Sequence, residues 1–386
     1  MKNRTWAEIN LDHLINNLKK IKQFLKEDTL ILAAVKGNAY GHDSVVVSEE
    51  LSEHIDYFGV ASVDEGIELR KNSIYKPILV LSPTLTDDIE RIIHYDLIPN
   101  IHTVGYAGAF SQYCNKHGLI RPVHIEIDTG MNRTGIDYRE AFDCIKEISS
   151  MSNITIEGIF SHFAEAEKDT GFAIEQKQRF DIITDRLKEE GIDFRSLHFA
   201  NSAAIVNQDN IDYNMVRPGI MIYGHYADES LKDKIDLTPV MTLKTRVCQV
   251  KILEKGDTVS YKRSFRADRR MKIATTLIGY GDGYSRLLSN RSQMYVNGKK
   301  ANVIGKVCMD LTMLDVSHIE DIKPGDEVEV FGETISVDEL AGISGMINYE
   351  ILTGIGPRVP RIFLKNNKIY KMKNIMANAN NRRNNE

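Results

Sequence analysis

The chain has 386 residues, of which 42% are hydrophobic and 27% charged, and its formal net charge at pH 7 is −5. This length favours two domains with large apolar cores, and the composition is that of a soluble globular protein. Without a basic stripe or an apolar run of membrane-spanning length, the sequence argues against nucleic acid and membrane as partners.

The first part of the chain alternates short apolar runs with longer segments of helical periodicity. Each run is rich in Val, Ile, Leu or Phe, which is typical of buried strands. The eight runs are 29–35, 56–62, 77–82, 97–102, 122–128, 155–162, 195–201 and 213–217. Segments such as 86–95 and 175–190 have an apolar residue every three or four positions, as amphipathic helices do. The pattern predicts an α/β protein with a parallel (β/α)8 barrel over residues 1–236.

From about residue 238 the segments become shorter and alternate apolar with polar residues. They cover 241–252, 273–278, 293–296, 303–307 and 327–331, and turn-forming sequences separate them. Asn297-Gly298 is the strongest hairpin signal among these turns. The pattern predicts a mostly antiparallel C-terminal β domain over residues 237–375. Residues 376–386 are polar and Asn-rich, and we expect them to form a disordered tail.

The four cysteines are Cys114, Cys144, Cys248 and Cys308, and they are scattered singly along the chain. Their spacing is neither that of a disulfide framework nor that of a zinc site, so we expect no metal. This usage suits a reducing compartment, and the N-terminus lacks the apolar core of a signal peptide. We therefore expect a cytoplasmic protein. We interpret Cys308 as a packing residue rather than a nucleophile.

Chemically active residues follow several of the predicted barrel strands, at the end where parallel barrels place their active sites. Lys36 follows the first strand, His162 ends the sixth and Arg217 ends the eighth. A lysine beside cations has a lowered pKa and is a candidate for Schiff-base formation. Ser202 and Gly219 follow strands seven and eight, where such barrels often bind phosphate. This placement indicates a phosphate-bearing carbonyl cofactor.

The motifs around these residues resemble those of the alanine racemase family over nearly the whole chain. Val35–His42 is similar to the family's cofactor-lysine motif, except that Gly37 replaces the usual alanine. Further family motifs occur in order at 128–133, 161–164, 201–204, 215–224, 259–261, 278–283 and 307–310. The resemblance implies a pyridoxal 5′-phosphate-dependent isomerase of fold type III that interconverts L- and D-alanine, either to supply D-alanine for the cell wall or for catabolism.

The resemblance also implies two catalytic bases, because racemisation removes a proton from one face of the substrate and returns it to the other. Lys36 would hold the cofactor and serve the D-alanine face, and Tyr261 would serve the L-alanine face. A phenol is a poor base at neutral pH, so His162, linked to Arg217, would stabilise its charged form. The other cofactor contacts that the resemblance implies are Tyr40, Arg133, Asn201, Ser202, Gly219 and Ile220.

Arg217 would face the pyridine nitrogen of the cofactor. An arginine cannot accept the pyridine proton, so the ring becomes a weaker electron sink and side reactions are suppressed. A decarboxylase on a related barrel would require a carboxylate at this position, and Arg217 argues against it. Another alternative is a non-catalytic, single-barrel carrier of the cofactor. Such a protein would lack Tyr261 and the second domain.

The substrate-binding residues implied by the resemblance are Arg133, Tyr280, Met309 and Asp310. The last three lie in the C-terminal domain, as does Tyr261. In the family this domain closes the barrel of the neighbouring subunit. The resemblance therefore implies a homodimer with shared active sites and a small amino acid as substrate.

Two positions depart from the family pattern. Glu126 stands where many members carry a carbamylated lysine, and we hypothesise that its carboxylate orients Arg133, directly or through a water. Pro357 stands where the family has a tyrosine that binds phosphate and narrows the substrate pocket. A serine or broad-specificity racemase on the same scaffold is therefore the alternative to an alanine racemase.

Overall fold

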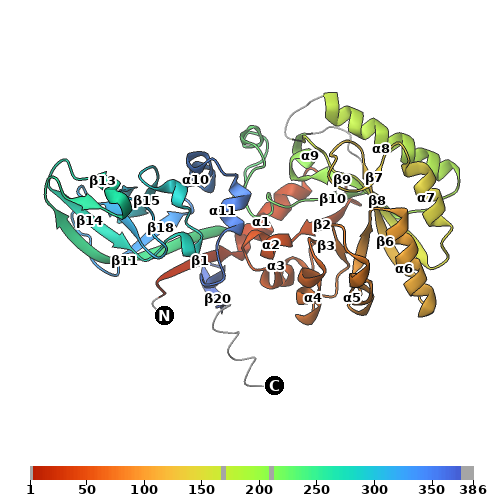
Figure 1. Ribbon diagram of the computed structural model, residues 1–386, viewed down its shortest axis with the longest axis horizontal. Helices are drawn as coiled ribbons and strands as arrows, with labels where there is room; N and C mark the ends of the chain where they lie inside the picture. The colour runs from red at the N-terminus through yellow and green to blue at the C-terminus, as the bar shows by residue number, and fades with distance from the viewer. Residues whose placement is uncertain (1–2, 167–170, 208–212, 375–386) are drawn as a thin grey trace, which may run out of the picture. The chain divides into compact units, whose positions relative to one another are not determined.

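The computed structural model describes residues 3–166, 171–207 and 213–374 (Figure 1). It divides into two compact units. The barrel unit comprises Ile15–Ala39 and Ser44–Leu237, and the β unit comprises Met1–Leu14, Tyr40–Asp43 and Thr238–Glu386. The tail expected at 376–386 lies outside the described residues.

The strands of the barrel unit form a closed parallel barrel. They are β2 (Leu30–Ala34), β3 (Tyr57–Val60), β4 (Ile78–Val80), β5 (Ile98–Ile101), β6 (Arg121–Asp128), β8 (Ile154–Phe160), β9 (Ser196–Asn201) and β10 (Met215–Arg217). The order is β5-β4-β3-β2-β10-β9-β8-β6, and a β5–β6 pairing closes the ring. A short strand, β7 (Ile136–Asp137), pairs with β6. Each predicted apolar run overlaps one barrel strand, so the predicted fold class is confirmed.

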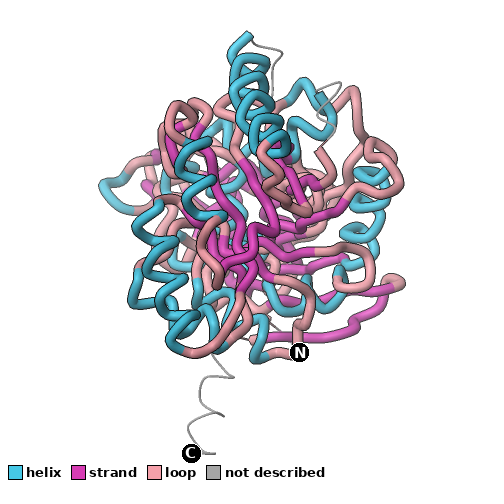
Figure 2. Tube along the Cα trace, turned by 90° about the vertical axis from the view of Figure 1, so that its right-hand side faces the viewer, coloured by secondary structure: helices cyan, strands magenta, loops and turns pink. Residues whose placement is uncertain are grey.

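Helices surround these strands, which occupy the centre of the barrel unit in Figure 2. They are α1 (Leu11–Lys22), α3 (Ser44–Leu51), α4 (Val63–Lys71), α5 (Ile89–His94), α6 (Val104–Lys116), α7 (Ala141–Ser149), α8 (Gly171–Glu189) and α9 (Ser202–Asn207), with 3-10 turns η1 (Thr86–Asp88) and η2 (Glu229–Leu231). Ser62 begins α4 by accepting a hydrogen bond from Glu65 N. In the described part of the chain, no helix is long and apolar enough to span a membrane.

The β unit is built on one mixed sheet. Its strands are β1 (Thr5–Asn10), β11 (Met241–Leu253), β14 (Met271–Thr276), β15 (Gln293–Val296), β16 (Lys299–Val303), β17 (Thr312–Asp315), β18 (Glu327–Phe331), β19 (Arg361–Lys365) and β20 (Lys368–Lys373). The order is β14-β17-β16-β15-β18-β11-β1-β19-β20, with a further β14–β11 pairing. Only β1 and β19 pair in parallel among these described strands, so the antiparallel character is confirmed.

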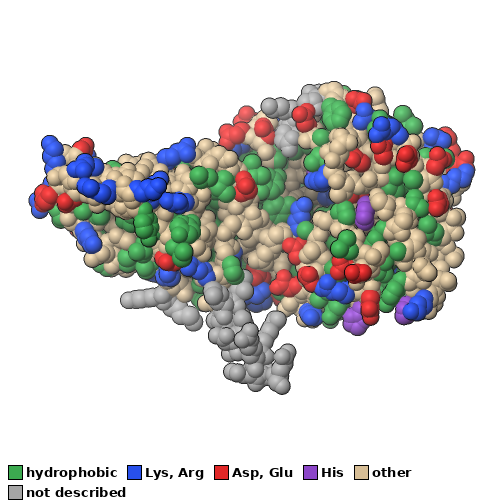
Figure 3. Space-filling model, viewed as in Figure 1, with side chains coloured by type: hydrophobic (Ala, Val, Ile, Leu, Met, Phe, Trp, Pro, Cys, Tyr) green, Lys and Arg blue, Asp and Glu red, His purple; other side chains and the backbone are tan. Residues whose placement is uncertain are grey.

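Short elements complete the β unit. The strands β12 (Thr258–Val259) and β13 (Phe265–Arg266) form a separate hairpin. The helices are α10 (Val337–Ser344) and α11 (Asn348–Thr353), and the 3-10 turns are η3 (Tyr261–Arg263), η4 (Tyr280–Asp282) and η5 (Arg286–Leu288). On the face shown in Figure 3, Lys and Arg side chains gather over the part of this unit that contains β13 and β14.

The predicted Asn297-Gly298 hairpin is confirmed, and the strand predicted at 303–307 is wrong. Asn297 and Gly298 have φ of 47° and 81° and join β15 to β16, as a two-residue hairpin with both central residues at positive φ requires. The strand that follows, β16, ends at Val303. Gly305 has φ of +78°, outside the extended region, so the strand cannot continue through it. The apolar residues that follow up to Val307 therefore reflect side-chain packing and not strand pairing.

The N-terminus differs from the predicted assignment of residues 1–236 to the barrel. β1 pairs with β11 and with β19, so residues 1–14 group with the β unit. The short segment Tyr40–Asp43 groups with the same unit. These pairings join segments more than two hundred residues apart, and no local pattern in the sequence indicates them.

Candidate active site

Lys36 begins a turn of unusual handedness at the end of β2. The turn is assigned as α2 (Lys36–Tyr40), but Gly37, Asn38 and Ala39 have φ/ψ of 62°/40°, 54°/48° and 52°/51°. For residues with a side chain, the left-handed region costs about 1–2 kcal/mol each, so the surrounding structure must hold the turn in place.

Hydrogen bonds on both sides of Lys36 supply this support. Ala39 N donates to Val35 O at 2.8 Å, and Gly37 N donates to Glu65 Oε1 at 2.8 Å. The main chain on either side of Lys36 is therefore tied to β2 and to α4. A lysine on such a turn has a fixed backbone from which its side chain extends.

The Lys36 side chain is solvent-accessible, and its pKa is nevertheless lowered. Dense packing of atoms around the amine is the main cause, and the charges of Arg133 and Arg217 act in the same direction. Glu65 partly opposes them. The sequence predicted this combination of a lysine with two arginines. A lowered pKa increases the fraction of neutral amine, which is the form that attacks a carbonyl or accepts a proton.

Arg217 is buried and held by five hydrogen bonds. Nη1 donates to His198 Nδ1 at 2.9 Å and to His198 O at 2.8 Å. Nη2 donates to Ser161 O at 2.7 Å, Phe199 O at 3.2 Å and His162 Nδ1 at 3.3 Å. Burial lowers the pKa of Arg217 to about 10, so the guanidinium remains charged at neutral pH. The predicted link between His162 and Arg217 is present.

A pair of histidines behind Arg217 was missed from the sequence. Because Arg217 donates to His198 Nδ1, the proton of His198 lies on Nε2, which donates to His124 Nδ1 at 2.8 Å. Burial, with the charge of Arg217, lowers the pKa of His124 and of His162 to about 3, and that of His198 well below its usual value. All three are therefore neutral at pH 7. A polar residue inside an apolar strand run was the available signal.

The predicted phosphate residues of the barrel unit lie together. Ser202 Oγ accepts a hydrogen bond from Gly219 N at 2.8 Å, and Ile220 is buried beside them in sequence. Asn201 Oδ1 accepts from Ala204 N at 3.0 Å, so this side chain begins α9. The remaining residue that the resemblance places at the phosphate, the buried Tyr40, belongs to the β unit, where its ring centroid lies 5.8 Å from that of Tyr349.

Glu126 has partners other than the expected Arg133. Its Oε2 accepts hydrogen bonds from Asn100 Nδ2 at 2.7 Å and from Thr134 Oγ1 at 2.9 Å. Glu126 is buried in β6 beside β5, whereas Arg133 lies in the exposed loop that follows β6. The negative charge of Glu126 instead raises the pKa of Arg217, against the effect of burial. Direct pairing with Arg133 was therefore the wrong expectation.

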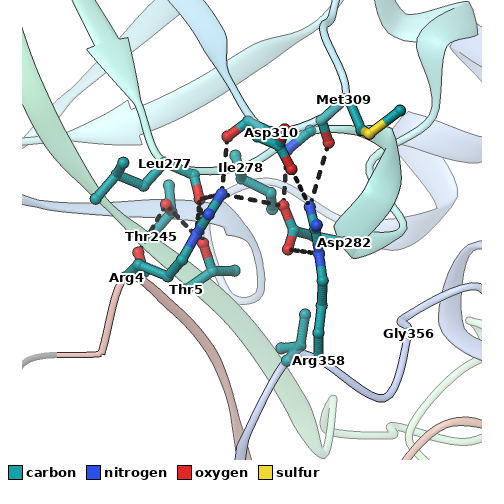
Figure 4. A network of polar contacts seen from close by, with 12 residues as sticks. Arg4, Thr5, Thr245, Leu277, Ile278, Asp282, Met309, Asp310, Gly356 and Arg358 are labelled. Carbon is teal, nitrogen blue, oxygen red and sulfur yellow. Dashed lines mark hydrogen bonds and ion pairs between the residues drawn. The ribbon is translucent and has the colours of Figure 1, made fainter. Parts of the chain in front are cut away.

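Two predicted substrate residues of the β unit, Met309 and Asp310, lie beside Asp282 of η4 in Figure 4, and main-chain hydrogen bonds join Tyr280 and its neighbour to the same segment. Tyr280 N donates to Cys308 O at 3.0 Å, and Gly281 N donates to Met309 O at 2.9 Å. The turn η4 is thereby fixed against residues 308–310. Tyr280 and Met309 remain 44% and 53% exposed, so their side chains are available to a ligand or a partner.

Tyr261 starts η3 and is 64% exposed. Ser260 before it donates from Oγ to Lys306 O at 2.7 Å. Cys308 is partly buried against an apolar cluster that includes Val259 and Ile304, which agrees with a packing role. Among the described residues, no group of three or more His, Cys, Asp or Glu side chains is arranged to hold a metal ion.

Comparison with known families covers both units. Residues 9–227 match the model of the alanine racemase N-terminal domain, and residues 240–363 match that of the C-terminal domain. The chain belongs to the alanine racemase family. Members of this family are isomerases, and this chain is therefore an isomerase.

Known members of the alanine racemase family match nearly the full length of the chain. The alanine racemase of Halothermothrix orenii is 42% identical over 363 residues, which are 92% of this chain and 96% of that protein. That of Clostridium novyi is 39% identical over 378 residues, covering 96% and 97%. The solved alanine racemase of Clostridium difficile 630 has a TM-score of 0.94 at 36% identity, covering 97% of this chain and 100% of that one. These matches give the serine alternative no support.

Proposed function

We propose that this chain interconverts L- and D-alanine in the cytoplasm, using pyridoxal 5′-phosphate held by Lys36. The observation that carries the proposal is the fixed turn that holds Lys36 at the end of β2, where the charges of Arg133 and Arg217 help to lower the pKa of its amine. A solved alanine racemase from Bartonella henselae contains covalently bound pyridoxal phosphate, at 27% identity and a TM-score of 0.86. One from Bacillus anthracis contains bound L-Ala-P, at 35% identity and a TM-score of 0.92.

The barrel residues fit this cofactor chemically. Ser202 accepts from Gly219 N and so keeps its own hydroxyl proton to donate to the phosphate, and Asn201, Ile220 and, in the β unit, Tyr40 are further candidates. The guanidiniums of Arg133 and Arg217 would face the phenolic oxygen and the ring nitrogen. When bound, the cofactor withdraws electrons from the substrate's α-carbon and so acidifies its proton.

Arg217 limits the reaction to proton transfer. Its five hydrogen bonds fix the guanidinium, its pKa of about 10 leaves it charged at neutral pH, and an arginine has no acceptor for a proton. A carboxylate at this position would stabilise a proton on the ring nitrogen and strengthen electron withdrawal. Arg217 therefore favours rapid return of a proton to the substrate over competing bond cleavages.

Lys36 and Tyr261 are the two proposed bases. The lowered pKa of Lys36 provides neutral amine to move a proton on the D-alanine face. Tyr261 would serve the L-alanine face of a neighbouring subunit, with Tyr280, Met309 and Asp310 contributing to the same opening. A large exposed fraction on Tyr261 supports a role at a subunit contact. His162 is neutral, so the positive charge that stabilises the Tyr261 phenolate would be that of Arg217. Its guanidinium polarises His162 through the hydrogen bond to Nδ1.

The test is α-proton exchange in deuterium oxide, followed by mass spectrometry and by circular dichroism of the amino acid. The purified chain with pyridoxal 5′-phosphate should racemise L-alanine and incorporate deuterium at the α-carbon. L-Serine in parallel tests the alternative raised by Pro357. Exchange with serine alone, or with neither amino acid despite bound cofactor, would contradict the proposal.

A further inference from the structure

Arg358 forms the right-hand side of the polar network in Figure 4, one residue after Pro357. Its Nε donates to Asp282 Oδ1 at 2.7 Å, and its Nη2 donates to Asp310 Oδ1 at 2.8 Å and to Met309 O at 3.3 Å. One guanidinium therefore joins three separate segments: the turn η4, residues 309–310 and the segment that contains Pro357.

Asp282 is the buried partner in this network, with a side chain only 3% exposed. Its second oxygen, Oδ2, accepts from Gly279 N at 3.0 Å and lies 3.7 Å from Arg4 Nη2. A carboxylate this deeply buried is destabilising unless it is paired and hydrogen-bonded. Arg358 supplies the pairing, and Asp282 in turn raises the pKa of Arg358.

Glycines allow the three segments to approach closely. A Cβ on Gly279 would lie 2.2 Å from Cys308 O, and one on Gly283 would lie 2.3 Å from Gly354 O. A Cβ on Gly281 would lie 2.7 Å from Arg358 Nη2 itself. The spacing of the segments is therefore set by main-chain contact and by the guanidinium between them.

We propose that Arg358 is a positioning residue for substrate binding, because it holds the Tyr280 turn and the Met309–Asp310 segment at one fixed spacing. This inference rests on the proposed function, in which Tyr280, Met309 and Asp310 contact the substrate. A lysine is a poor substitute, since its single ammonium cannot make the planar, divergent contacts of the guanidinium. Arg358 has no part in moving the proton, so its loss should weaken binding rather than slow the reaction step.

The experiment compares Arg358→Met and Arg358→Lys with Arg246→Met as a matched control. Arg246 is also a partly buried arginine of the β unit, and it pairs with Glu327, Asn3 O and Gly325 O, away from the three segments. Removing Arg358 should raise KM for both L- and D-alanine about tenfold and change kcat less than threefold. Inhibition by propionate, a carboxylate without the reacting amine, should weaken in the same proportion. Arg246→Met should lower Tm without raising KM.

Gly281→Ala gives a second route if Arg358→Met does not fold. The added Cβ would lie 2.7 Å from Arg358 Nη2 and 3.0 Å from Met309 O, so it should displace the guanidinium, lower Tm and raise KM in the same direction. Unchanged KM and unchanged propionate inhibition in the folded Arg358 and Gly281 variants would overturn the inference. A wild-type chain that fails to racemise alanine would overturn the proposed function instead, so the two failures are distinguishable.

Discussion

The turn after Lys36 and the turn around Tyr261 are both strained, and they are stabilised in different ways. Gly37, Asn38 and Ala39 occupy the left-handed helical region, whereas Ser260 has φ/ψ of 65°/−175°, a conformation that is almost exclusive to glycine. Lys262 also has positive φ, at 59°. Strain of about 1–3 kcal/mol at such residues persists only where the surroundings enforce it.

The surroundings of the two turns differ in kind. The Lys36 turn is hydrogen-bonded to β2 and α4, and charges of the barrel unit lower the pKa of the amine. The Tyr261 turn is held by the Ser260–Lys306 hydrogen bond and by contact with Gly305, and the tyrosine itself is exposed. The barrel unit thus fixes both the backbone of the Lys36 turn and the charges around its amine. The β unit fixes only the backbone of the Tyr261 turn, as we expect for a residue that serves the active site of another subunit.

Lys36→Ala should have the largest effect. Without the amine, both the visible absorption of the lysine-bound cofactor and racemisation should be lost, because Lys36 has both roles in the proposal. Absorption spectra and α-proton exchange on the same sample provide the measurement. A retained band that borohydride reduces onto another residue would show that Lys36 is the wrong lysine.

Tyr261→Phe should separate the two faces of the substrate. Racemisation should fall about 10²–10⁴-fold in both directions, because the equilibrium constant is one and kcat/KM must fall equally. Exchange of the α-proton with solvent should survive for D-alanine, through Lys36, and be lost for L-alanine. Retained exchange of L-alanine would remove Tyr261 from the mechanism.

Gly305→Ala tests whether the Tyr261 turn depends on its packing. A Cβ there would lie 2.8 Å from Ser260 Cβ on a residue with φ of +78°, so the turn must shift. We expect L-alanine exchange to fall about tenfold while the cofactor absorption stays. The matched control is Gly37→Ala, also at positive φ, which should cost about 1 kcal/mol of stability with little loss of activity. Equal activity losses in the two variants would remove the distinction between the turns.

Acid should destabilise the barrel unit through its buried neutral histidines. Below its usual pKa of 6.5 a histidine of the unfolded chain binds a proton, whereas folded His124 and His162 bind one only near pH 3. Stability is therefore complete above pH 6.5 and falls as pH decreases toward 3, by up to about 1.4 kcal/mol per pH unit for each histidine. Urea unfolding between pH 7.5 and 5.5 measures this slope. His124→Asn should reduce it, and an unchanged slope would contradict the burial effect.

The barrel and much of the candidate site could be predicted from the sequence, because both depend on local sequence patterns. Each of the eight apolar runs overlaps a strand, and the residues that follow the runs, among them Lys36, Ser202 and Gly219, lie where parallel strands end. The histidine pair His124–His198 was missed, since its two members are polar residues inside buried runs and meet only when the barrel closes.

Long-range strand pairing and backbone strain also could not be predicted from the sequence. The pairing of β1 with β11 and β19 joins distant segments, and β16 begins with Lys299-Lys300, which hides its strand character. The left-handed turn after Lys36 left two signals, Gly37 and Asn38, since glycine and asparagine adopt this region most readily, whereas Ala39 gives none. The hydrogen bond from Asn100 to Glu126 likewise could not be predicted, because Asn100 lies on the neighbouring strand β5.

Mixing two inactive variants tests the two-subunit site most directly. Lys36→Ala and Tyr261→Ala chains, unfolded and refolded together, would form heterodimers with one intact site, made from Lys36 of one chain and Tyr261 of the other. With random association, half of the dimers have one such site of two, so activity should recover to about a quarter of wild type. Each variant refolded alone should remain inactive. No recovery in heterodimers confirmed by mass spectrometry would show that both bases act within one chain, and would contradict the account.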